Sequence, residues 1–498
     1  MRRAVVGYSA ESQKGGVLLK RCYAGVTDNL LARDFDMAAD WLTHQYPNSF
    51  SIVWDLAAFT NAVFSLLPLA TQEKLHTETR VYVNQYIKIF SVDRWFGLTV
   101  TKPLHGNFYE KRETNFFGVD RFMPSGTAQP TDPDQVADYG NDILAGFERM
   151  GIAPDKLTSP VGVFADELRG YELPTIYTNP DIEDACGYCI PMMRYEWRSA
   201  FILGFFEMAY SYDQVAAYPY FIANLPDTDK CRVQFSDTYI KSDWAIVKGE
   251  IEVDADISPI VYSEGEGHIN PKGKWQRYFT KEEATWLLRR QLGKFKMIDG
   301  YFIDWLSPRK PYRAPVSKLF SMRLAGDDMV NNLAKKASQG ISGKLDQDNE
   351  DGTLGELYNP VLAAMTRSRC RLAVANFIYD NALLDSVLAV QVDGVITNRQ
   401  VDTRGDGSMG SWRLDTVSPA LVVSKGEVWK PGKKPLNIAY DELVAAIREH
   451  PQRSYYEVGN NYIDLSLPVL DADREYSDYP RTGGDLLTKV YRSRAIAI

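Results

Sequence analysis

Several features that would place this chain in a common class are scarce or missing. Five cysteines and five histidines in 498 residues exclude a disulfide framework and leave little material for a zinc centre. No apolar run reaches the ~18 residues of a membrane span, and the first residues, MRRAVVGYSAE, lack the apolar core of a signal peptide. Neither a Gly-x-x-x-x-Gly-Lys phosphate loop nor a Gly-x-Ser-x-Gly nucleophile motif occurs. We therefore expect a soluble, cytoplasmic protein that contacts no membrane.

A metal-type spacing occurs at Cys186-x-x-Cys189. A zinc site needs a second pair of ligands, and the other three cysteines are single and distant in the sequence. The pair is therefore more simply explained as incidental.

Net positive charge is also lacking, since the chain carries −9, which argues against a nucleic-acid partner. The distribution changes this interpretation. Between Lys272 and Lys344 there are 16 Lys+Arg against 6 Asp+Glu, a local balance of +10 that leaves −19 for the rest. Such a segment suits a protein that grips a polyanion with one part only, although a solvated surface of charged helices explains it equally well.

The pattern of apolar residues predicts a mixed α/β chain, long enough for two to four domains. We expect strands at 49–54, 79–92 and 201–213, a loop at 122–135, a helix at 134–150, and a helix followed by a strand at 372–397. The region 281–344 reads as helical, with a loop at 307–315 between two basic helices.

Two carboxylates stand in unusually apolar strand contexts: Asp213 in AYSYDQVAAYP and Asp393 in VLAVQVDGVIT. A buried carboxylate is costly unless it is paired or bound to a metal ion. Phosphoryl transfer from a nucleoside triphosphate needs carboxylates at fixed positions to hold divalent ions. Alternatively, each Asp could cap a helix or lie at a solvated strand end.

A basic helical face lies between the two carboxylates in the sequence. Lys335, Gln339 and Ser342 follow an i, i+4, i+7 spacing, and Arg323 falls near the same face if the helix is continuous. Such a face could neutralise a triphosphate and its pyrophosphate leaving group. An amphipathic surface helix gives the same pattern.

The order of these motifs resembles that of family B DNA polymerases. YDQVAAYP resembles motif A, KKASQGISGKL motif B and VQVDGVIT motif C, while YNPVLAAMTRSRCRL and MGSWRLD resemble elements that flank motif C. Five elements in order over about 200 residues are more specific than any one of them. The long stretch between motifs A and B is similar to that of the protein-primed phage and plasmid branch, where it holds an inserted subdomain.

The resemblance implies an α/β architecture with an RNase H-like exonuclease domain, a palm built on an antiparallel sheet, helical fingers and a small thumb. The implied boundaries are 1–190 for the exonuclease-like domain, 191–280 for the first part of the palm with the inserted subdomain, 281–345 for the fingers, 346–425 for the second part of the palm and 426–498 for the thumb.

The resemblance also implies residue roles. Asp213 and Asp393 would bind two Mg²⁺ (or Mn²⁺) ions, with the Val215 carbonyl as a further ligand, and Tyr218 would exclude a 2′-hydroxyl. The implied nucleotide contacts are Arg323, Lys335, Gln339 and Lys344. Three residues depart from the family pattern: Gln339 replaces Asn, Ser342 replaces Tyr, and Gln391 replaces the first Asp of motif C.

The exonuclease motifs are degenerate. VGYSAES supplies Ser9 and Glu11 where the family has Asp-x-Glu, Phe59-Thr60 stands where Phe-Asp is usual, and DYGNDI supplies Asp142. Glu11 and Asp142 would be the remnant of a four-carboxylate site too weak to hold two ions. In a shifted register Asp55 could become a ligand.

The resemblance thus implies a DNA polymerase that acts on primer-template DNA and deoxynucleoside triphosphates, without proofreading. A terminal protein or other replication proteins are further candidate partners. Three alternatives remain. The first is a catalytically degenerate DNA-binding accessory protein. The second is a primase-like or RNA-making enzyme on the same scaffold, which Tyr218 opposes, and the third is an unrelated hydrolase or nucleotide-binding module.

Overall fold

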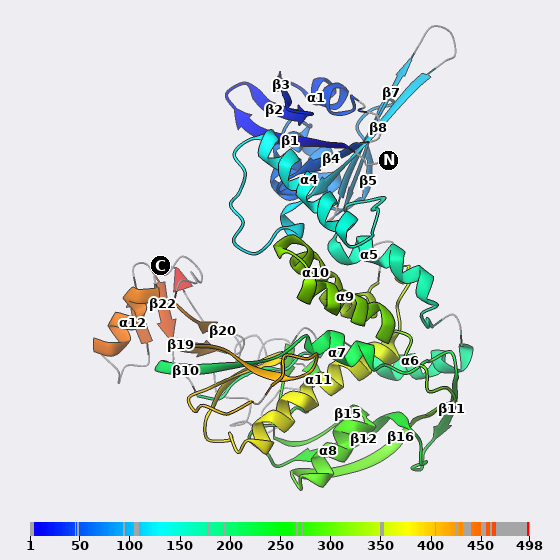
Figure 1. The fold of residues 1–498 in the computed structure, drawn as a ribbon, viewed down its shortest axis with the longest axis vertical. Helices are drawn as coiled ribbons and strands as arrows, with labels where there is room; N and C mark the ends of the chain where they lie inside the picture. Colours follow the sequence, from blue (N-terminus) through cyan, green and yellow to red (C-terminus); the bar gives the residue numbers. More distant parts are fainter. Residues whose placement is uncertain are drawn as a thin grey trace. The chain divides into compact units, whose positions relative to one another are not determined.

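A computed structural model describes residues 4–44, 46, 49–92, 95–103, 109–176, 179–193, 195–202, 204–264, 267–270, 272–348, 353–403, 405–424, 427–431, 440–449, 455–458, 461–464 and 496–497. The chain divides into two compact units (Figure 1). The first comprises Met1–Glu172 with Ser317–Gly340, and the second comprises Leu173–Val316 with Ile341–Ile498. No helix within the described ranges is long and apolar enough to cross a membrane.

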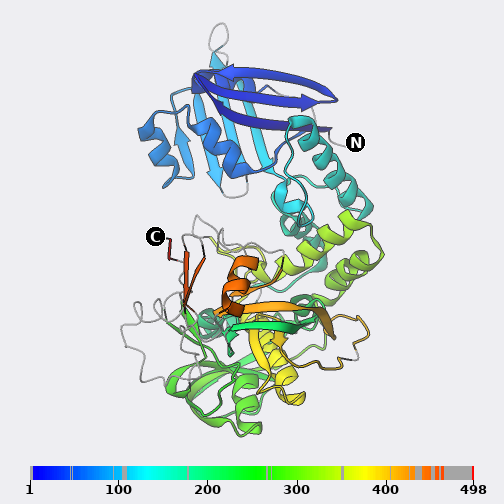
Figure 2. The same ribbon diagram turned by 90° about the vertical axis from the view of Figure 1, so that its left-hand side faces the viewer.

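The first unit is built on one eight-stranded sheet in the order β3-β2-β1-β4-β8-β7-β6-β5 (Figure 2). β1, β4 and β8 run parallel, and the other neighbours are antiparallel. Its strands are β1 (Ala4–Gln13), β2 (Gly16–Tyr23), β3 (Val26–Ala32), β4 (Ser49–Val53), β5 (Arg80–Tyr82), β6 (Ile87–Val92), β7 (Trp95–Pro103) and β8 (Tyr109–Gly118). Its helices are α1 (Phe35–Leu42), α2 (Leu56–Phe64), α3 (Leu69–Leu75), α4 (Pro133–Arg149), α5 (Pro160–Leu168) and most of α9 (Arg313–Ala325) and α10 (Asp328–Lys344).

Alternating side chains of β1 separate two layers of helices. Val6 and Tyr8 lie in the core formed with α1 and α2, whereas Gly7 faces α4. A Cβ atom at Gly7 would lie 2.2 Å from the Pro133 carbonyl oxygen, so α4 can approach β1 only because this residue is glycine. The predicted start of α4 is confirmed: the Asp132 carboxylate accepts the Gln135 backbone N–H at 3.0 Å.

The segment predicted as one strand at 79–92 is instead the hairpin of β5 and β6. The Asn84 side chain accepts the backbone N–H groups of Tyr86 and Ile87, at 2.8 and 2.9 Å. Because this side chain satisfies the turn locally, the chain reverses where composition alone favoured a continuous strand.

The second unit contains a six-stranded antiparallel sheet in the order β20-β19-β10-β18-β17-β9. Its strands are β9 (Arg198–Ala200), β10 (Gly204–Gln214), β17 (Val387–Gln391), β18 (Gly394–Thr397), β19 (Trp412–Ser424) and β20 (Glu427–Trp429). The helices α6 (Glu183–Cys189), α7 (Ala217–Ala223) and α11 (Pro360–Asp380) belong to the same unit. The buried Asn359 caps α11 by accepting the Leu362 backbone N–H at 3.2 Å, and Pro360 occupies the first turn.

A four-stranded antiparallel sheet, β11-β16-β12-β15, lies between α7 and α9 in the sequence. Its elements are β11 (Cys231–Ser236), β12 (Trp244–Val253), β15 (Gly273–Thr280), α8 (Lys281–Arg289) and β16 (Gly293–Trp305), and a hairpin of β13 (Tyr262–Glu264) and β14 (Gly267–Ile269) interrupts the series. The remaining elements are α12 (Tyr440–Glu449), β21 (Tyr455–Val458), β22 (Asn461–Asp464) and β23 (Ile496–Ala497). Most of the predicted thumb lies outside the described residues.

The prediction that 281–344 is helical holds for α8 but was wrong for Gly293–Trp305, which form the strand β16. β16 pairs with both β11 and β12, and two-sided pairing stabilises a strand beyond its local propensity. The second half forms two helices, α9 and α10, rather than one continuous helix, because α9 ends before Gly326. Arg323 and Lys335 therefore lie on different helices. The predicted start of the fingers at 281 falls between β15 and β16, and the five-domain division stays a prediction.

Several cations of the basic segment pair with carboxylates from elsewhere in the chain. These ion pairs are Lys272–Asp256, Lys274–Glu250 at 2.8 Å, Arg290–Asp380 at 2.6 Å, Lys294–Glu252 at 3.1 Å and Lys318–Glu167 at 2.7 Å. In the opposite sense, Arg369 and Arg371 from outside the segment pair with its Glu282 and Glu283. The excess of +10 therefore does not by itself define a polyanion site.

A buried ionic network joins α8 to α11. The Glu283 carboxylate accepts from the guanidinium groups of Arg371, at 2.6 Å, and Arg277, at 3.3 Å. The same carboxylate accepts the Thr280 backbone N–H at 3.0 Å, which completes the capping box at the start of α8. Glu283 and Arg371 are at most 1% exposed, so each depends on the other for compensation of its charge.

Candidate active site

The structure brings Asp213 and Asp393 together on neighbouring strands of the six-stranded sheet. Asp213 lies near the end of β10 and pairs with Gly394, the first residue of β18. Asp393 is the second residue of the two-residue turn between β17 and β18. The Gln214 backbone N–H donates to the Asp393 carbonyl at 3.4 Å. Two carboxylates that are 180 residues apart in the sequence thus meet at one edge of the sheet.

Backbone strain is present beside both carboxylates. Val392 has a φ of 62° and Ala216 has a φ of 49°, and both values lie in the left-handed region that disfavours residues with a Cβ. A valine is especially costly there because its side chain is β-branched. The Val392 backbone N–H donates to the Trp197 carbonyl at 2.8 Å, which holds the turn in this conformation. Strained positions of this kind concentrate at functional sites.

Electrostatics distinguish the two carboxylates. Burial, together with the negative charge of Asp213, raises the pKa of Asp393 to about 6. Asp213 is more exposed, and its carboxylate lies 3.4 Å from the guanidinium of Arg413, its neighbour on β19. The same guanidinium lies 3.4 Å from Asp415. The site thus holds a half-buried carboxyl whose pKa is raised and a second carboxylate that is partly compensated by a cation.

Tyr218, on α7, packs against α11 close to Asp393. The Arg367 guanidinium lies 4.8 Å from the centre of the Tyr218 ring and forms an ion pair with Asp346 at 3.2 Å. Burial raises the pKa of Tyr218, and the charges of Glu196 and Asp393 contribute in the same direction. The Tyr218 hydroxyl therefore stays protonated, and its ring is held rigidly by the cation above it.

Glu196 is a site residue that sequence reasoning missed. It immediately precedes the buried Trp197, whose carbonyl holds Val392, and its charge contributes to raising the pKa of Asp393. Its carboxylate pairs with Arg198 at 2.9 Å. No local pattern within RYEWRSA marks Glu196 as a candidate, because its position depends on the pairing of β9 with β17.

The predicted nucleotide contacts are divided between the two units. Arg323, Lys335 and Gln339 belong to the first unit, and Lys335 and Gln339 are exposed on α10. The neighbouring Lys336 donates to the carbonyls of Arg121 and Met123, at 2.8 and 2.6 Å, and so anchors the helix.

Lys344 belongs to the second unit, where its ammonium donates to the Gln347 side chain at 2.7 Å. The buried Val215 backbone accepts the Gly410 N–H at 2.7 Å, which leaves one lone pair of its carbonyl oxygen for another ligand. Of the predicted nucleotide-binding residues, Val215 and Tyr218 lie close to the two carboxylates. Lys344 belongs to the same unit as the carboxylates.

The predicted exonuclease remnant has a different character. Glu11 is exposed on β1 and pairs with Lys20 at 3.6 Å, and Asp142 is exposed on α4. The Thr60 hydroxyl donates to the Leu56 carbonyl at 2.9 Å, as threonines commonly do within helices. Asp55 caps α2 by accepting the Ala58 backbone N–H at 3.0 Å, which explains its presence without a metal ion.

The cysteine pair behaves as apolar side chains. Cys186 and Cys189 are buried on α6. Within the described residues, no group of three or more His, Cys, Asp or Glu side chains could hold a metal ion. Burial raises the pKa of the Cys186 thiol to about 12, which makes it a poor ligand and nucleophile.

The donor set at the sheet edge fits Mg²⁺ better than a cage-forming metal. Mg²⁺ keeps most of its water and is held by one or two carboxylates together with substrate phosphates. Asp213, Asp393 and the Val215 carbonyl are the oxygen atoms that would hold such an ion here, and a divalent ion would offset the repulsion that raises the pKa of Asp393.

No protein-family model and no curated protein sequence matches the chain. Solved structures do match. The chain has a fold similar to that of DNA polymerases. Among the solved structures that it resembles is Phi29 DNA polymerase. The orthorhombic crystal form of that enzyme aligns with 86% of this chain and 87% of its own, at 11% identity and a TM-score of 0.61.

Two complexes of Phi29 DNA polymerase give the same result. The ternary complex with primer-template DNA and incoming nucleotide substrates aligns over 86% and 87% of the two chains, at 11% identity and a TM-score of 0.58. The complex with single-stranded DNA aligns over 87% and 90%, at 12% identity and a TM-score of 0.59. The predicted likeness to a DNA polymerase is confirmed at the level of the fold.

Proposed function

We propose that this protein is a template-directed DNA polymerase that adds deoxynucleotides to the 3′ end of a primer. One observation carries the proposal: Asp213 and Asp393 meet at the edge of one antiparallel sheet, on a fold similar to Phi29 DNA polymerase over most of both chains. Burial and mutual repulsion of these carboxylates favour divalent ions as their partners.

The chain's own residues would position the reactants. Asp213 and Asp393, with the Val215 carbonyl, would hold two Mg²⁺ or Mn²⁺ ions, which supply Lewis-acid activation and charge neutralisation in phosphoryl transfer. The Tyr218 ring, fixed by Arg367, would lie beneath the sugar and exclude a 2′-hydroxyl. Arg323, Lys335, Gln339 and Lys344 would contact the incoming triphosphate or the template.

The N-terminal sheet would be an exonuclease-like domain that does not proofread. The exposure of Glu11 and Asp142, and the helical hydrogen bond of Thr60, support this part of the proposal. The substrates would be primer-template DNA and deoxynucleoside triphosphates, with a terminal protein or other replication proteins as further partners. The five domains keep their predicted boundaries within this proposal.

A second candidate is a degenerate polymerase that binds primed DNA without extending it. The pairing of Asp213 with Arg413 favours it, because a protein cation already compensates one of the two carboxylates. The replacement of the first motif C carboxylate by Gln391 points in the same direction.

Primer extension separates the two candidates. We expect the wild-type protein to extend a labelled primer on a DNA template with Mg²⁺ or Mn²⁺, and Asp213→Asn to lose extension. Asp380→Asn is the matched control, since it removes a charge from an exposed surface ion pair. If wild type binds primed DNA with either metal but extends nothing, the accessory role replaces the polymerase.

A further inference from the structure

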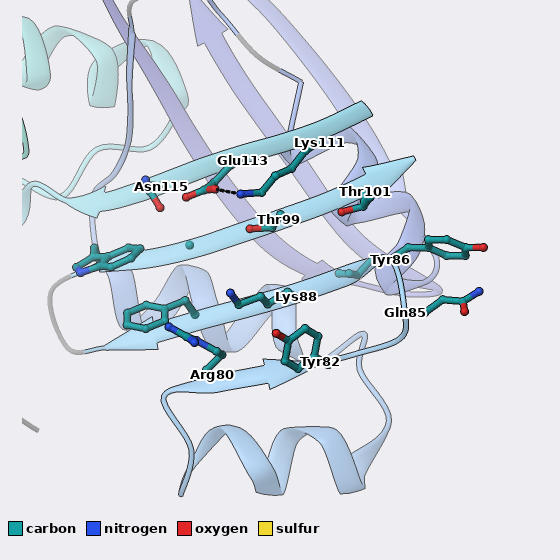
Figure 3. A pocket seen from close by; sticks show the side chains of 14 residues that line it. Arg80, Tyr82, Gln85, Tyr86, Lys88, Thr99, Thr101, Lys111, Glu113 and Asn115 are labelled. Carbon is teal, nitrogen blue, oxygen red and sulfur yellow. Dashed lines mark ion pairs between the residues drawn. The ribbon is translucent and has the colours of Figure 1, made fainter. Parts of the chain in front are cut away.

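One face of the N-terminal sheet packs against α4 at β1 and β4, but its part formed by β5–β8 is hollowed among the described residues. Ile89, Leu98 and Phe116 point into the core beneath α1 and α2. The opposite side chains of β5–β8 line an open hollow of about 440 Å³ (Figure 3). Neither Glu11 nor Asp142 lines it. The candidate nuclease remnant therefore does not account for this face.

The side chains on this face form cross-strand rows. Arg80, Phe90, Gly97 and Asn115 are successive partners across the four strands. Tyr82, Lys88, Thr99 and Glu113 form the next row (Figure 3). Aromatic rings and cations therefore lie next to one another along the hollow instead of forming separate patches.

Gly97 creates a platform for an aromatic ring. A Cβ at this position would lie 2.7 Å from the Trp95 indole, so the indole occupies the space above the glycine. The Trp95 ring also stacks on Phe90, with ring centres 4.6 Å apart and an interplanar angle of 21°. Two large rings are thus held in place on the outer side of a strand pair instead of in the core.

Cations accompany the rings. The Arg80 guanidinium lies 5.8 Å from the centre of the Phe90 ring, and the Lys88 ammonium lies 5.8 Å from the centre of the Tyr82 ring. Tyr82 is 67% exposed, so one side of its ring is open to solvent. Lys111 adds a third cation, which pairs with Glu113 at 3.0 Å (Figure 3).

The hollow is therefore lined by three cations and one carboxylate, on a chain whose net charge is −9. Its local charge attracts a polyanion, and its rings offer flat apolar surfaces. A ligand with aromatic rings and a negatively charged backbone matches both properties.

We propose that this face binds single-stranded nucleic acid, with bases stacked on Tyr82 and Trp95 and phosphates neutralised by Arg80, Lys88 and Lys111. Exposed rings interleaved with cations are the general means of binding single strands without sequence preference. A duplex cannot use them, because its base faces are already stacked. The proposal does not depend on the polymerase reaction.

The test measures the binding of the full chain to a fluorescein-labelled oligothymidylate of about 10 nucleotides, the footprint scale of such surfaces. The buffer contains EDTA and no nucleotide, so two-metal chemistry plays no part. We expect Tyr82→Ala and Trp95→Ala each to weaken binding about tenfold. Tyr239→Ala, which removes an equally exposed ring in the other unit, should leave the affinity unchanged.

The salt dependence tests the cations separately. For single strands, each lost phosphate contact should reduce the slope of log K against log salt by roughly 0.7. Lys88→Ala should show this change, and Lys156→Ala, an exposed lysine elsewhere in the same unit, should not. An oligouridylate of the same length distinguishes DNA from RNA as the natural ligand, and binding of either supports the proposal.

Photocrosslinking locates the strand. An oligonucleotide containing 5-iodouracil should crosslink to peptides that contain Tyr82, Phe90 or Trp95. Because Tyr82 is on the surface, Tyr82→Ala should preserve the melting temperature, which keeps the test interpretable even if Trp95→Ala unfolds the domain. Unchanged affinity of Tyr82→Ala, crosslinks confined to the second unit, or equal competition by blunt duplex DNA would each overturn the proposal.

Discussion

The candidate carboxylates of the two units differ in burial and in distance from one another. In the second unit, Asp213 and Asp393 converge at a sheet edge between two strained residues, and burial raises the pKa of Asp393. In the first unit, Glu11 and Asp142 are exposed, and the neighbouring Asp55 serves as a helix cap. Convergence, burial and strain together distinguish a site under functional constraint from carboxylates that solvent can accommodate at little cost.

The largest expected effect is on primer extension, and it tests the difference between the two units directly. Asp393→Asn should lower the primer-extension rate by about 10³-fold, because a metal-bound carboxylate supplies several kcal/mol of transition-state stabilisation. Glu11→Gln should leave extension unchanged, and neither wild type nor this variant should excise a mismatched 3′ nucleotide. Metal-dependent excision by the wild type would show that the first unit keeps an active nuclease.

The ionic groups of the two units should also differ in their contribution to stability. Glu283→Ala should reduce the free energy of unfolding by about 3–5 kcal/mol, because Arg371 would be left buried without its partner. In the first unit Asp166→Ala should cost less than about 1 kcal/mol, because both side chains of the Asp166–Arg169 ion pair are exposed, at 49% and 62%. Urea denaturation of the two variants measures both values. Equal losses would contradict the assignment of Glu283 to a buried network.

The stability of the protein should depend on pH because of the repulsion between Asp213 and Asp393 in the second unit. The pKa of Asp393 is raised from 3.8 to about 6, so the folded, metal-free protein binds this proton more tightly than the unfolded chain does. The resulting stabilisation is complete below about pH 4 and is lost as the pH rises through 6, a change of at most about 3 kcal/mol. The difference in unfolding free energy between wild type and Asp393→Asn, measured in EDTA from pH 4 to 7, isolates it. A difference that does not vary with pH would refute the burial of this carboxyl.

The smallest expected effect concerns backbone strain. Val392→Gly should raise the free energy of unfolding by about 1 kcal/mol, because glycine adopts a φ of 62° without the penalty of a β-branched residue. Ala24→Gly, at a φ of 51° in the turn between β2 and β3, should gain less because alanine is less hindered there. Thermal melts of both variants provide the measurement. A larger gain from Ala24→Gly would show that Val392 is not the more strained of the two residues.

Local signals in the sequence predicted much of the secondary structure. The Asp132 cap with Pro133 marks the start of α4, and the apolar run before Asp213 became β10. β16 was missed because the basic residues around it suggested helices, whereas pairing on both sides makes it a strand. The continuity assumed between Arg323 and Lys335 failed at Gly326, where α9 ends.

The candidate site was predictable only in part. Asp213 and Asp393 could be selected because carboxylates in apolar strands are unusual, and Tyr218 because the sequence around it resembles motif A. Glu196 could not, because nothing local shows that the strand beginning at Arg198 pairs with β17 and brings it towards the turn that holds Asp393. The hollowed face of β5–β8 was equally hidden, since its rings and cations form rows only after four strands pair.

By itself, then, the sequence determined the composition, the helix caps, the apolar strands and the order of the motifs, because these depend on residues close together in the chain. Tertiary structure alone decided that Asp213 and Asp393 are neighbours, that several cations of the basic segment pair with distant carboxylates, and that the side chains of β5–β8 line a hollow on one face of their sheet. The physical reason is that burial, repulsion and charge compensation depend on distances in space, which strand pairing sets between residues far apart in the chain.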